Sequence, residues 1–171
     1  NATDYGKALC EELIKNMANR KYNILIVSGL AYGIDIHAHK SALKYKIPTV
    51  AVVGHGLDKI YPSLHADIAR KMLYNGGILS DFPGGTKIDP SNFIRRNRIV
   101  AGLADATIVI ESAPKGGALI TADIAFSYNR DVFAFPGRVD ALYSKGCNQL
   151  IRGNGASLIQ GIDDLEYFMS W

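Results

Sequence analysis

One aromatic ring and three guanidinium groups stand close together in the segment Asn92–Arg98. These groups belong to Phe93, Arg95, Arg96 and Arg98. An arginine fork matches the geometry of a phosphate and an aromatic face can stack on a base, which is the combination that single-stranded nucleic acid requires. From Gly84 to Arg98 four basic residues accompany one acid, Asp89, so this segment alone accounts for a balance equal to the net charge of +3 of the chain.

A structural role for the same arginines is the alternative interpretation. A helix that starts here would place them beside acids on neighbouring elements. Adjacent positions on a helix differ by about 100° in direction, so Arg96 and Arg98 need not both face a ligand. One of them can instead pair with a buried acid, and the segment by itself leaves both interpretations open.

Three glycine-bearing turns follow predicted strands, where free N–H groups at a helix start favour anions. The first turn contains Ser28, Gly29 and Gly33, the second contains Gly54-His55-Gly56, and the third contains Lys115-Gly116-Gly117. None has the Gly-Lys-Ser/Thr triplet of a phosphate-binding P-loop, and none is a complete Gly-x-Gly-x-x-Gly. The first turn is a possible anion-binding turn. Equally, the glycines can serve only to permit the turns.

Titratable residues give little support for catalysis or for a metal. His37 and His39 are two apart on a predicted helix, so they point away from each other and cannot share an ion. Asp35 and His39 do share a face, and we expect a helix-start acid bonded to an imidazole in preference to a catalytic dyad. No Gly-x-Ser-x-Gly elbow is present. The sequence therefore predicts no enzyme activity, no metal and no cofactor.

Composition is that of an ordinary globular protein of the cytoplasm. The chain has 171 residues with 48% hydrophobic and 20% charged residues, which predicts one domain, spanning 1–171, with a sizeable core. No apolar run is long enough to cross a membrane, and the two cysteines make no disulfide framework. The isoelectric point of about 8.8 permits a polyanionic partner.

Apolar runs alternate with helical patterns along the whole chain. Continuous apolar runs at 24–27, 50–53 and 107–110 predict central strands of a parallel sheet, and weaker runs lie at 77–80, 132–135 and 157–159. Helical spacing is found at 5–20, 34–45, 63–74, 92–104, 118–128, 146–152 and 163–169. The pattern predicts an α/β fold with a doubly wound, mostly parallel sheet. Because a helix comes first, we expect a strand before it to be missing from this sequence, as in a fragment of a longer protein.

Seven ordered blocks of the sequence resemble the DNA-processing protein A family, also called DprA or Smf. The blocks cover nearly the whole chain, from about residue 5 to 160. They are Ser28–Asp35 with Ala38-His39, Gly54–Pro62, Leu79–Thr86, Asn92-Phe93 with Arg96–Leu103, Gly117–Ala122, Phe135-Pro136-Gly137 and Ser144–Ile151.

The resemblance implies an extended Rossmann-like domain that binds single-stranded DNA without sequence preference. It also implies a homodimer that loads the RecA recombinase during natural transformation and recombination, and no catalytic activity. Carried onto matching positions, the DNA site comprises Phe93, Arg96, Asn97 and Arg98 with Lys115, Gly116 and Gly117. For the dimer, an apolar stripe of Leu165, Phe168 and Met169, with Trp171 beyond it, is a second hint, although the stripe could equally pack on its own sheet.

Departures from the family pattern keep an alternative open. The family's first strand ends in a Gly-Ser/Thr-Arg turn that contacts DNA, and this sequence starts after that point. Tyr32 and Gly117 stand where the family more often has Arg and Ser. The alternative is a nucleotide-binding or nucleoside-monophosphate-hydrolysing enzyme of Rossmann-like fold. Its Pro-Gly-Gly-x-Gly-Thr loop is only partly matched by Phe82–Thr86.

Overall fold

Helices and strands alternate from end to end in the computed structural model, which describes residues 2–20 and 22–171. The helices are α1 (Asp4–Arg20), α2 (Ile34–Lys44), α3 (Ala66–Met72), α4 (Pro90–Leu103), α5 (Gly117–Ser127), α6 (Lys145–Arg152) and α7 (Ile162–Met169). The strands are β1 (Ile26–Ser28), β2 (Thr49–Val52), β3 (Gly76–Leu79), β4 (Ala106–Val109), β5 (Asp131–Ala134) and β6 (Ser157–Leu158). Short 3₁₀ turns at Ser63–His65 and Leu142–Ser144 precede α3 and α6. Every predicted helix and strand is therefore present, with boundaries that differ by at most three residues.

The strands form two separate parallel sheets of three strands each. The first sheet has the order β1-β2-β3 and the second has the order β4-β5-β6. The α/β class and the parallel pairing are confirmed. The expectation that 24–27 and 107–110 are central strands is wrong, because β1 and β4 each lie at the edge of their sheet; only β2 is central among the three predicted.

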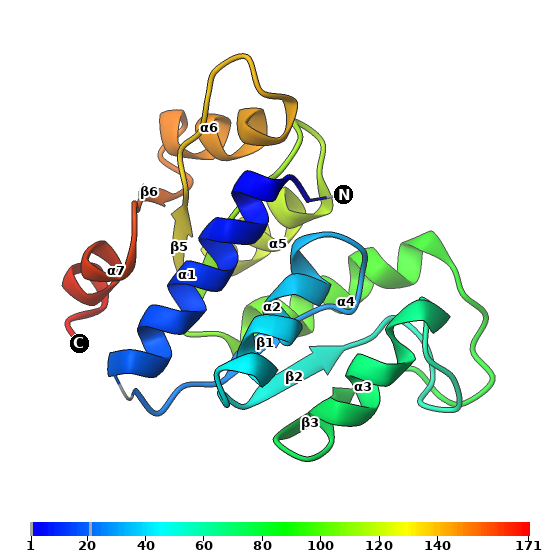
Figure 1. Cartoon of the computed structure of the whole chain (residues 1–171). Helices are drawn as coiled ribbons and strands as arrows, with labels where there is room; N and C mark the ends of the chain where they lie inside the picture. The colour runs from blue at the N-terminus through cyan, green and yellow to red at the C-terminus, as the bar shows by residue number, and fades with distance from the viewer. Residues whose placement is uncertain (1, 21) are drawn as a thin grey trace.

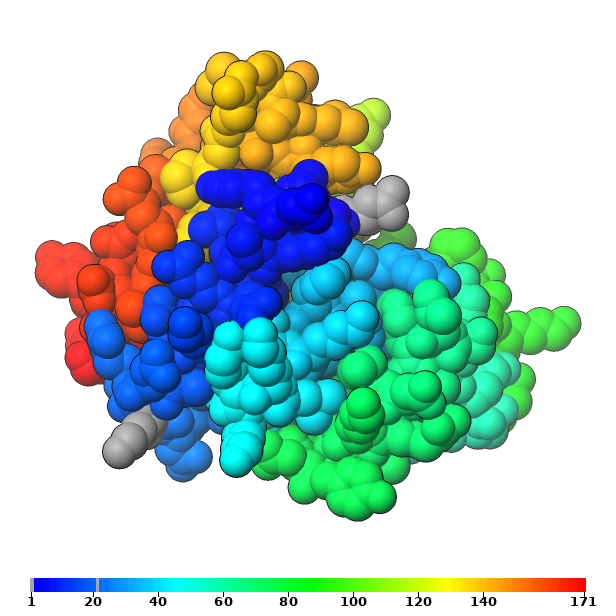
Figure 2. Space-filling model, viewed as in Figure 1, coloured from blue at the N-terminus to red at the C-terminus, as the bar shows by residue number. Residues whose placement is uncertain are grey.

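Helix α1 joins the two halves of the molecule. Figure 1 shows it lying across the space between the β5–β6 side and the β1–β3 side, and Figure 2 shows its surface between the same two halves. Its buried side chains belong to one apolar cluster that contains residues of α2 and also residues of β5 and α7. Members of this cluster include Cys10, Leu13, Ile14, Met17, Ala38, Ala42, Phe133 and Leu165. Apolar burial against both halves therefore holds the two sheets together.

The start of α1 is tied to the end of β4. Glu111, two residues beyond β4, accepts hydrogen bonds from the backbone N–H and from the hydroxyl of Thr3, the first at 3.0 Å. The carboxylate is buried, so these donors offset part of the cost of removing its charge from water. Helix α1 thus begins at the carboxyl end of β4.

The C-terminal helix uses its apolar stripe mainly inside its own fold. Leu165 is fully buried and Met169 packs against the same cluster. Phe168 lies with its ring centroid 5.5 Å from that of Phe133, yet 46% of it is exposed, and Trp171 is 49% exposed. Part of the apolar stripe that predicted a dimer is therefore buried within the chain's own fold. Phe168 and Trp171 remain partly exposed. No described helix is long and apolar enough to cross a membrane.

Gly76, at the start of β3, gives a direct test of the sheet register. Its φ is +148°, and a Cβ built there would lie 1.8 Å from the carbonyl oxygen of Thr49 in β2, whereas a Cβ on Gly77 meets nothing within 4 Å. We expect Gly76→Ala to lower the free energy of unfolding by at least about 2 kcal/mol and Gly77→Ala to change it by less than about 1 kcal/mol. Urea denaturation measures both, and equal effects of the two variants would contradict the β2–β3 pairing.

Candidate nucleic-acid interface

Helix α4 carries the aromatic residue and the arginines that the sequence singled out. Asp89 caps its start by accepting the backbone N–H of Ser91 at 2.8 Å, and Pro90 occupies the first turn, where its missing N–H costs nothing. The hydrogen bonds from Ser91 hold the pKa of the Asp89 carboxyl below its ordinary value. The cap fixes where the helix begins. Because residues three and four apart share a helix face, Phe93, Arg96 and Asn97 lie together.

Arg96 is the buried member of the arginine group. Only 5% of it is exposed, and its guanidinium donates a hydrogen bond to the carbonyl oxygen of Val52 at the end of β2. Its Nε donates to Oδ1 of Asn97 at 3.1 Å. Burial lowers the pKa of the guanidinium from its ordinary value, and the charge of the nearby Asp35 carboxylate acts in the opposite direction. Arg96 therefore fastens α4 to the first sheet.

A small cavity opens beside Arg96. Its volume is about 120 Å³, and its lining combines three aromatic side chains with the Arg96 side chain and the Gly54 turn. The aromatic residues are Tyr32, Tyr61 and Phe93. The ring centroids of Tyr61 and Phe93 are 5.9 Å apart, and the guanidinium carbon of Arg96 lies 6.0 Å from the centroid of the Phe93 ring. The cavity thus offers aromatic faces next to a buried positive charge.

Tyr61 was not assigned a role from the sequence, although it lies in one of the blocks that carry the family resemblance. It follows the turn after β2 and is brought to Phe93 by tertiary structure alone, with the backbone N–H of Tyr61 donating to Nε2 of His55 at 3.2 Å. Tyr61 is 44% exposed, as a platform for a ligand requires. The sequence signal that could have identified Tyr61 was an aromatic residue in a loop that follows a predicted parallel strand.

The other two arginines face solvent. The guanidinium of Arg95 lies over the ring of Phe82, 5.4 Å from its centroid. Arg98 forms an ion pair with Asp81, in which the Arg98 side chain is 48% exposed and that of Asp81 is 25% exposed. The sequence left open which arginine is buried, and the structure places Arg96 inside and Arg98 outside.

The first glycine turn packs against the buried arginine. A Cβ on Gly29 would lie 2.7 Å from a terminal nitrogen of Arg96 and 2.2 Å from Oδ2 of Asp35, so only glycine lets the turn approach this closely. The Ser28 hydroxyl donates to Oδ1 of Asp35 at 2.9 Å. Gly33, with a φ of +99°, immediately precedes α2. Ser28, Gly29 and Gly33 are therefore held by their own neighbours at the edge of the site.

The predicted bond between Asp35 and His39 is absent from this part of the chain. Asp35 accepts from Ser28 and, at 3.3 Å, from the backbone N–H of Ala31. His39 is fully buried, with Nε2 bonded to the carbonyl oxygen of Gly29 and Nδ1 lying 2.6 Å from the hydroxyl oxygen of Thr49. Burial lowers the pKa of this imidazole. The expectation was wrong because each side chain has a nearer partner outside the helix; His39 ties β1 to β2 instead.

The loop Lys115-Gly116-Gly117 lies apart from this cavity, at the end of β4 and the start of α5. Lys115 is exposed, and the Gly116 N–H donates to the carbonyl oxygen of Ala113 at 3.0 Å. The predicted residues on α4 follow β3, and the loop Lys115-Gly116-Gly117 follows β4. These two strands are edge strands of different sheets. Among the described residues no group of His, Cys, Asp and Glu side chains is arranged to hold a metal ion.

Replacing the buried guanidinium tests its structural role. We expect Arg96→Met to lower the free energy of unfolding by about 2–4 kcal/mol, because the Val52 carbonyl and the Asp35 carboxylate lose their buried partner. Arg95→Met, on the exposed side of the same helix, should change it by less than about 1 kcal/mol. Chemical denaturation of both variants provides the measurement. An Arg96→Met protein as stable as the Arg95→Met protein would show that the buried contact is dispensable.

Comparison with solved structures identifies close neighbours of the fold. DNA processing protein A from Streptococcus pneumoniae is 37% identical with a TM-score of 0.86, over 96% of this chain and 56% of that protein. DNA processing protein A from Helicobacter pylori, whose single-stranded DNA binding mode has been determined, is 30% identical with a TM-score of 0.87, over 99% of this chain and 75% of that one. A molybdenum cofactor carrier protein from Chlamydomonas reinhardtii, at 12% identity and a TM-score of 0.60, shares the fold alone.

Sequence comparison gives the same result. Protein Smf from Synechocystis is 45% identical over 157 residues, covering 92% of this chain but 39% of the relative. DNA processing protein DprA from Bacillus subtilis is 38% identical, covering 96% of this chain and 54% of the relative. The chain thus spans about two fifths to one half of the length of these two relatives. The sequence model of DNA recombination-mediator protein A matches residues 1–170. The chain belongs to the DNA recombination-mediator protein A family, the family of DprA and Smf.

Proposed function

We propose that residues 1–171 act as one domain that binds single-stranded DNA without sequence preference through the surface around α4. The observation that carries this proposal is the cavity lined by Tyr32, Tyr61 and Phe93 beside the Arg96 guanidinium. Aromatic faces accept any base, because every base has a π-face, and a positive charge attracts the backbone. The DNA-binding relative from Helicobacter pylori, which has the same fold at 30% identity, supports the proposal.

Each predicted residue has a distinct part in this proposal. Phe93 stacks on a base, and Arg96 supplies a fixed positive charge from within while Asn97 holds its Nε. Arg98 reaches the phosphates after it releases Asp81; the cost is small, since partly exposed ion pairs contribute about 0–1 kcal/mol. Lys115, Gly116 and Gly117 contact further phosphates beyond the cavity. Ser28, Gly29 and Gly33 pack at the edge of the cavity and support the Arg96 side chain.

The biological role in this proposal is DNA processing for natural transformation and recombination, in the cytoplasm, with RecA as the protein partner. The domain binds and hands over DNA and carries out no catalysis. The runner-up hydrolase is disfavoured by the loop that partly resembles its nucleotide site. There the Gly85 N–H, which an incoming phosphate would need, donates to Oδ1 of Asp58 at 3.1 Å, and the Thr86 hydroxyl donates to the carbonyl oxygen of Pro83 at 2.6 Å.

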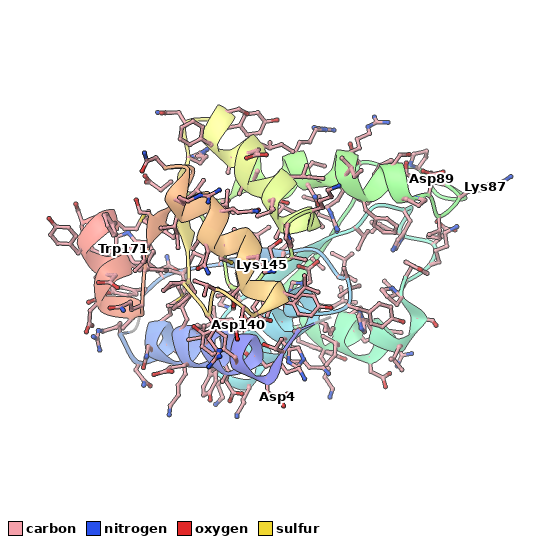
Figure 3. The ribbon with its side chains drawn as sticks, turned by 90° about the horizontal axis from the view of Figure 1, so that it is seen from above. Asp4, Lys87, Asp89, Asp140, Lys145 and Trp171 are labelled. Atoms are coloured by element: carbon pink, nitrogen blue, oxygen red, sulfur yellow. The ribbon has the colours of Figure 1, made fainter. Side chains whose placement is uncertain are left out.

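A homodimer is part of the same proposal. Figure 3 shows Lys87 and Asp89, just before α4, at one end of the molecule and Trp171 at the other. The exposed aromatic residues of the C-terminal part can therefore meet a second copy without covering the α4 surface. These residues are Tyr167, Phe168 and Trp171.

The aromatic contribution is tested by Phe93→Ala. We expect this variant to lose about 1–3 kcal/mol of binding free energy for labelled oligothymidylate, the value of one stacked base, with an almost unchanged dependence on salt. Fluorescence anisotropy at several salt concentrations measures both quantities, and thermal denaturation verifies that the variant is folded. Parental affinity in a folded Phe93→Ala protein would place the DNA site elsewhere.

The electrostatic contribution is tested by Arg98→Ala. Loss of one phosphate contact should reduce the slope of log affinity against log salt by roughly 0.7 for a single strand. Arg70→Ala is the matched control, since Arg70 is an exposed arginine on α3 with an ion pair to Asp67. The same titration applies to both proteins. An equal reduction in both slopes, or none in Arg98→Ala, would speak against a specific contact at Arg98.

The dimer is tested by light scattering of the 171-residue chain at high micromolar concentration. We expect a mass near twice 18.6 kDa, and we expect Phe168→Ser to shift the equilibrium toward the monomer because it removes exposed apolar surface. Phe126→Ser is the control, as Phe126 is an exposed phenylalanine on α5. A monomer mass for the parent chain would contradict a dimer formed by this domain alone.

A further inference from the structure

His55 lies fully buried at the start of the turn between β2 and α3, and both of its ring nitrogens have backbone partners. Nδ1 lies 2.8 Å from the carbonyl oxygen of Gly56, and Nε2 lies 3.2 Å from the backbone nitrogen of Tyr61. A carbonyl oxygen only accepts a hydrogen bond, and a backbone N–H only donates one. These partners therefore assign a neutral ring with its proton on Nδ1 and a free lone pair on Nε2.

The bond between Nε2 and Tyr61 links the two ends of the turn and reaches the aromatic cavity. The N–H that His55 accepts belongs to the residue whose ring centroid lies 5.9 Å from that of Phe93. The start of the turn is fixed to its surroundings. A Cβ on Gly54 would lie 3.0 Å from the Phe93 ring, and the Ser80 hydroxyl donates to the carbonyl oxygen of His55 at 2.6 Å. His55 is therefore a fixed point from which the position of Tyr61 relative to Phe93 is set.

Protonation reverses the character of Nε2. An imidazolium ring carries an N–H on both nitrogens, so Nε2 then meets the N–H of Tyr61 as a second donor. Two donors in this position repel each other, and a buried N–H without an acceptor costs free energy. The backbone of Tyr61 must then move away from His55, and its ring moves away from Phe93. Imidazole is the side chain that ordinarily changes its charge near neutral pH.

The surroundings of His55 do not replace this hydrogen bond by an ion pair. The charged and titratable side chains on the elements around His55 are those of Asp58, Lys59, His65, Asp81, Arg96 and Arg98. Asp58 accepts the N–H of Gly85, which holds the pKa of its carboxyl below its ordinary value. Asp81 is paired with Arg98. Both acids have partners of their own and the His55 ring binds backbone groups, so protonation acts through the bond to Tyr61.

We propose that His55 is a positioning residue of the DNA site, which holds Tyr61 beside Phe93 when neutral and releases it, weakening the binding of single-stranded DNA, when protonated. This inference rests on the proposed DNA site around α4. Its sign sets it apart from a general effect of charge. Acid adds positive charge to the protein, which by itself strengthens the attraction for a polyanion. Release of Tyr61 predicts the opposite, a weaker complex in acid.

The test titrates oligothymidylate with a pH-insensitive label against the 171-residue chain, from about pH 8 to about pH 5 at constant ionic strength. We expect the affinity of the parent chain to fall by roughly five- to tenfold in acid. His55→Gln places an amide oxygen that does not titrate near the position of Nε2. This variant should bind like the parent at the upper pH and should not weaken in acid. His37→Gln, at a partly buried histidine on α2, is the control and should follow the parent.

A second variant removes the acceptor at every pH. His55→Leu should bind roughly five- to tenfold more weakly than the parent at the upper pH, because the Tyr61 N–H has lost its partner. Thermal denaturation verifies that the variants are folded, and if His55→Leu unfolds, the parent chain and His55→Gln still decide. Parent binding that does not weaken in acid, or an equal loss in His55→Gln, would overturn the positioning role.

NMR without DNA separates this inference from the proposed DNA site. In the isotope-labelled chain we expect the His55 proton on Nδ1 at the upper pH, and a Tyr61 amide shift that follows protonation of the ring. The amide of Val53, which donates to the carbonyl oxygen of Leu79 at 2.9 Å, is the internal control and should move far less. A ring that stays neutral throughout, or a Tyr61 amide that does not follow it, overturns the inference whatever the DNA result.

The DNA site is judged separately by Phe93→Ala. Weaker binding by Phe93→Ala together with an unresponsive Tyr61 amide would leave the DNA site standing and remove the role of His55. Parental affinity of Phe93→Ala would overturn both the site and the release of DNA by His55, even where the Tyr61 amide follows the ring.

Discussion

The hydrogen bond from the Arg96 guanidinium to the Val52 carbonyl is the contact on which the candidate site depends. It inserts a charged side chain of α4 between the ends of β1 and β2, where only a residue without Cβ fits at position 29. A buried guanidinium requires partners, and the Val52 carbonyl, the Asn97 amide oxygen and the Asp35 carboxylate are near enough to compensate it. Since Phe93 lies one turn earlier on the same helix face, the contact that fixes Arg96 also fixes the aromatic wall of the cavity.

A rigid positive charge under an aromatic cavity combines two properties of a nucleic-acid site. The guanidinium needs no reorganisation when a ligand arrives, because its hydrogen bonds already hold it, and the reduced solvent around it weakens screening. Arg98 differs from Arg96, since its ion pair with Asp81 lies at the surface. A phosphate can replace Asp81 as the partner of Arg98. In the proposed DNA site, Arg96 shapes the cavity, and we expect Arg98 to be the contact that responds to salt.

Local sequence patterns predicted the elements well, because each apolar run and each helical stripe is a short-range signal. The strand at 50–53 and the helix at 92–104 were found within two residues of β2 and α4. What failed depended on neighbours far along the chain. Apolar character alone does not tell a central strand from an apolar edge strand, so β1 and β4 were placed wrongly at the centre.

The candidate site shows the same contrast between short-range sequence signals and contacts made by residues far apart along the chain. Phe93 and the arginines were visible as residue types in one segment, but the choice between Arg96 and Arg98 for the interior depends on where the Val52 carbonyl ends its strand. Asp35 and His39 share a helix face, yet Ser28 and Gly29 supply nearer partners from the turn before the helix. Tyr61 reaches Phe93 only through the folded chain.

The most direct test of DNA binding at α4 is photo-crosslinking of oligothymidylate that carries 4-thiothymidine, followed by mass spectrometry of the crosslinked peptides. The aromatic cavity predicts that crosslinks concentrate on the peptides that contain Phe93 and Tyr61, whose ring centroids lie 5.9 Å apart, and that unlabelled oligothymidylate abolishes them. Crosslinks confined to the C-terminal helix, with none at Phe93 or Tyr61, would contradict the account.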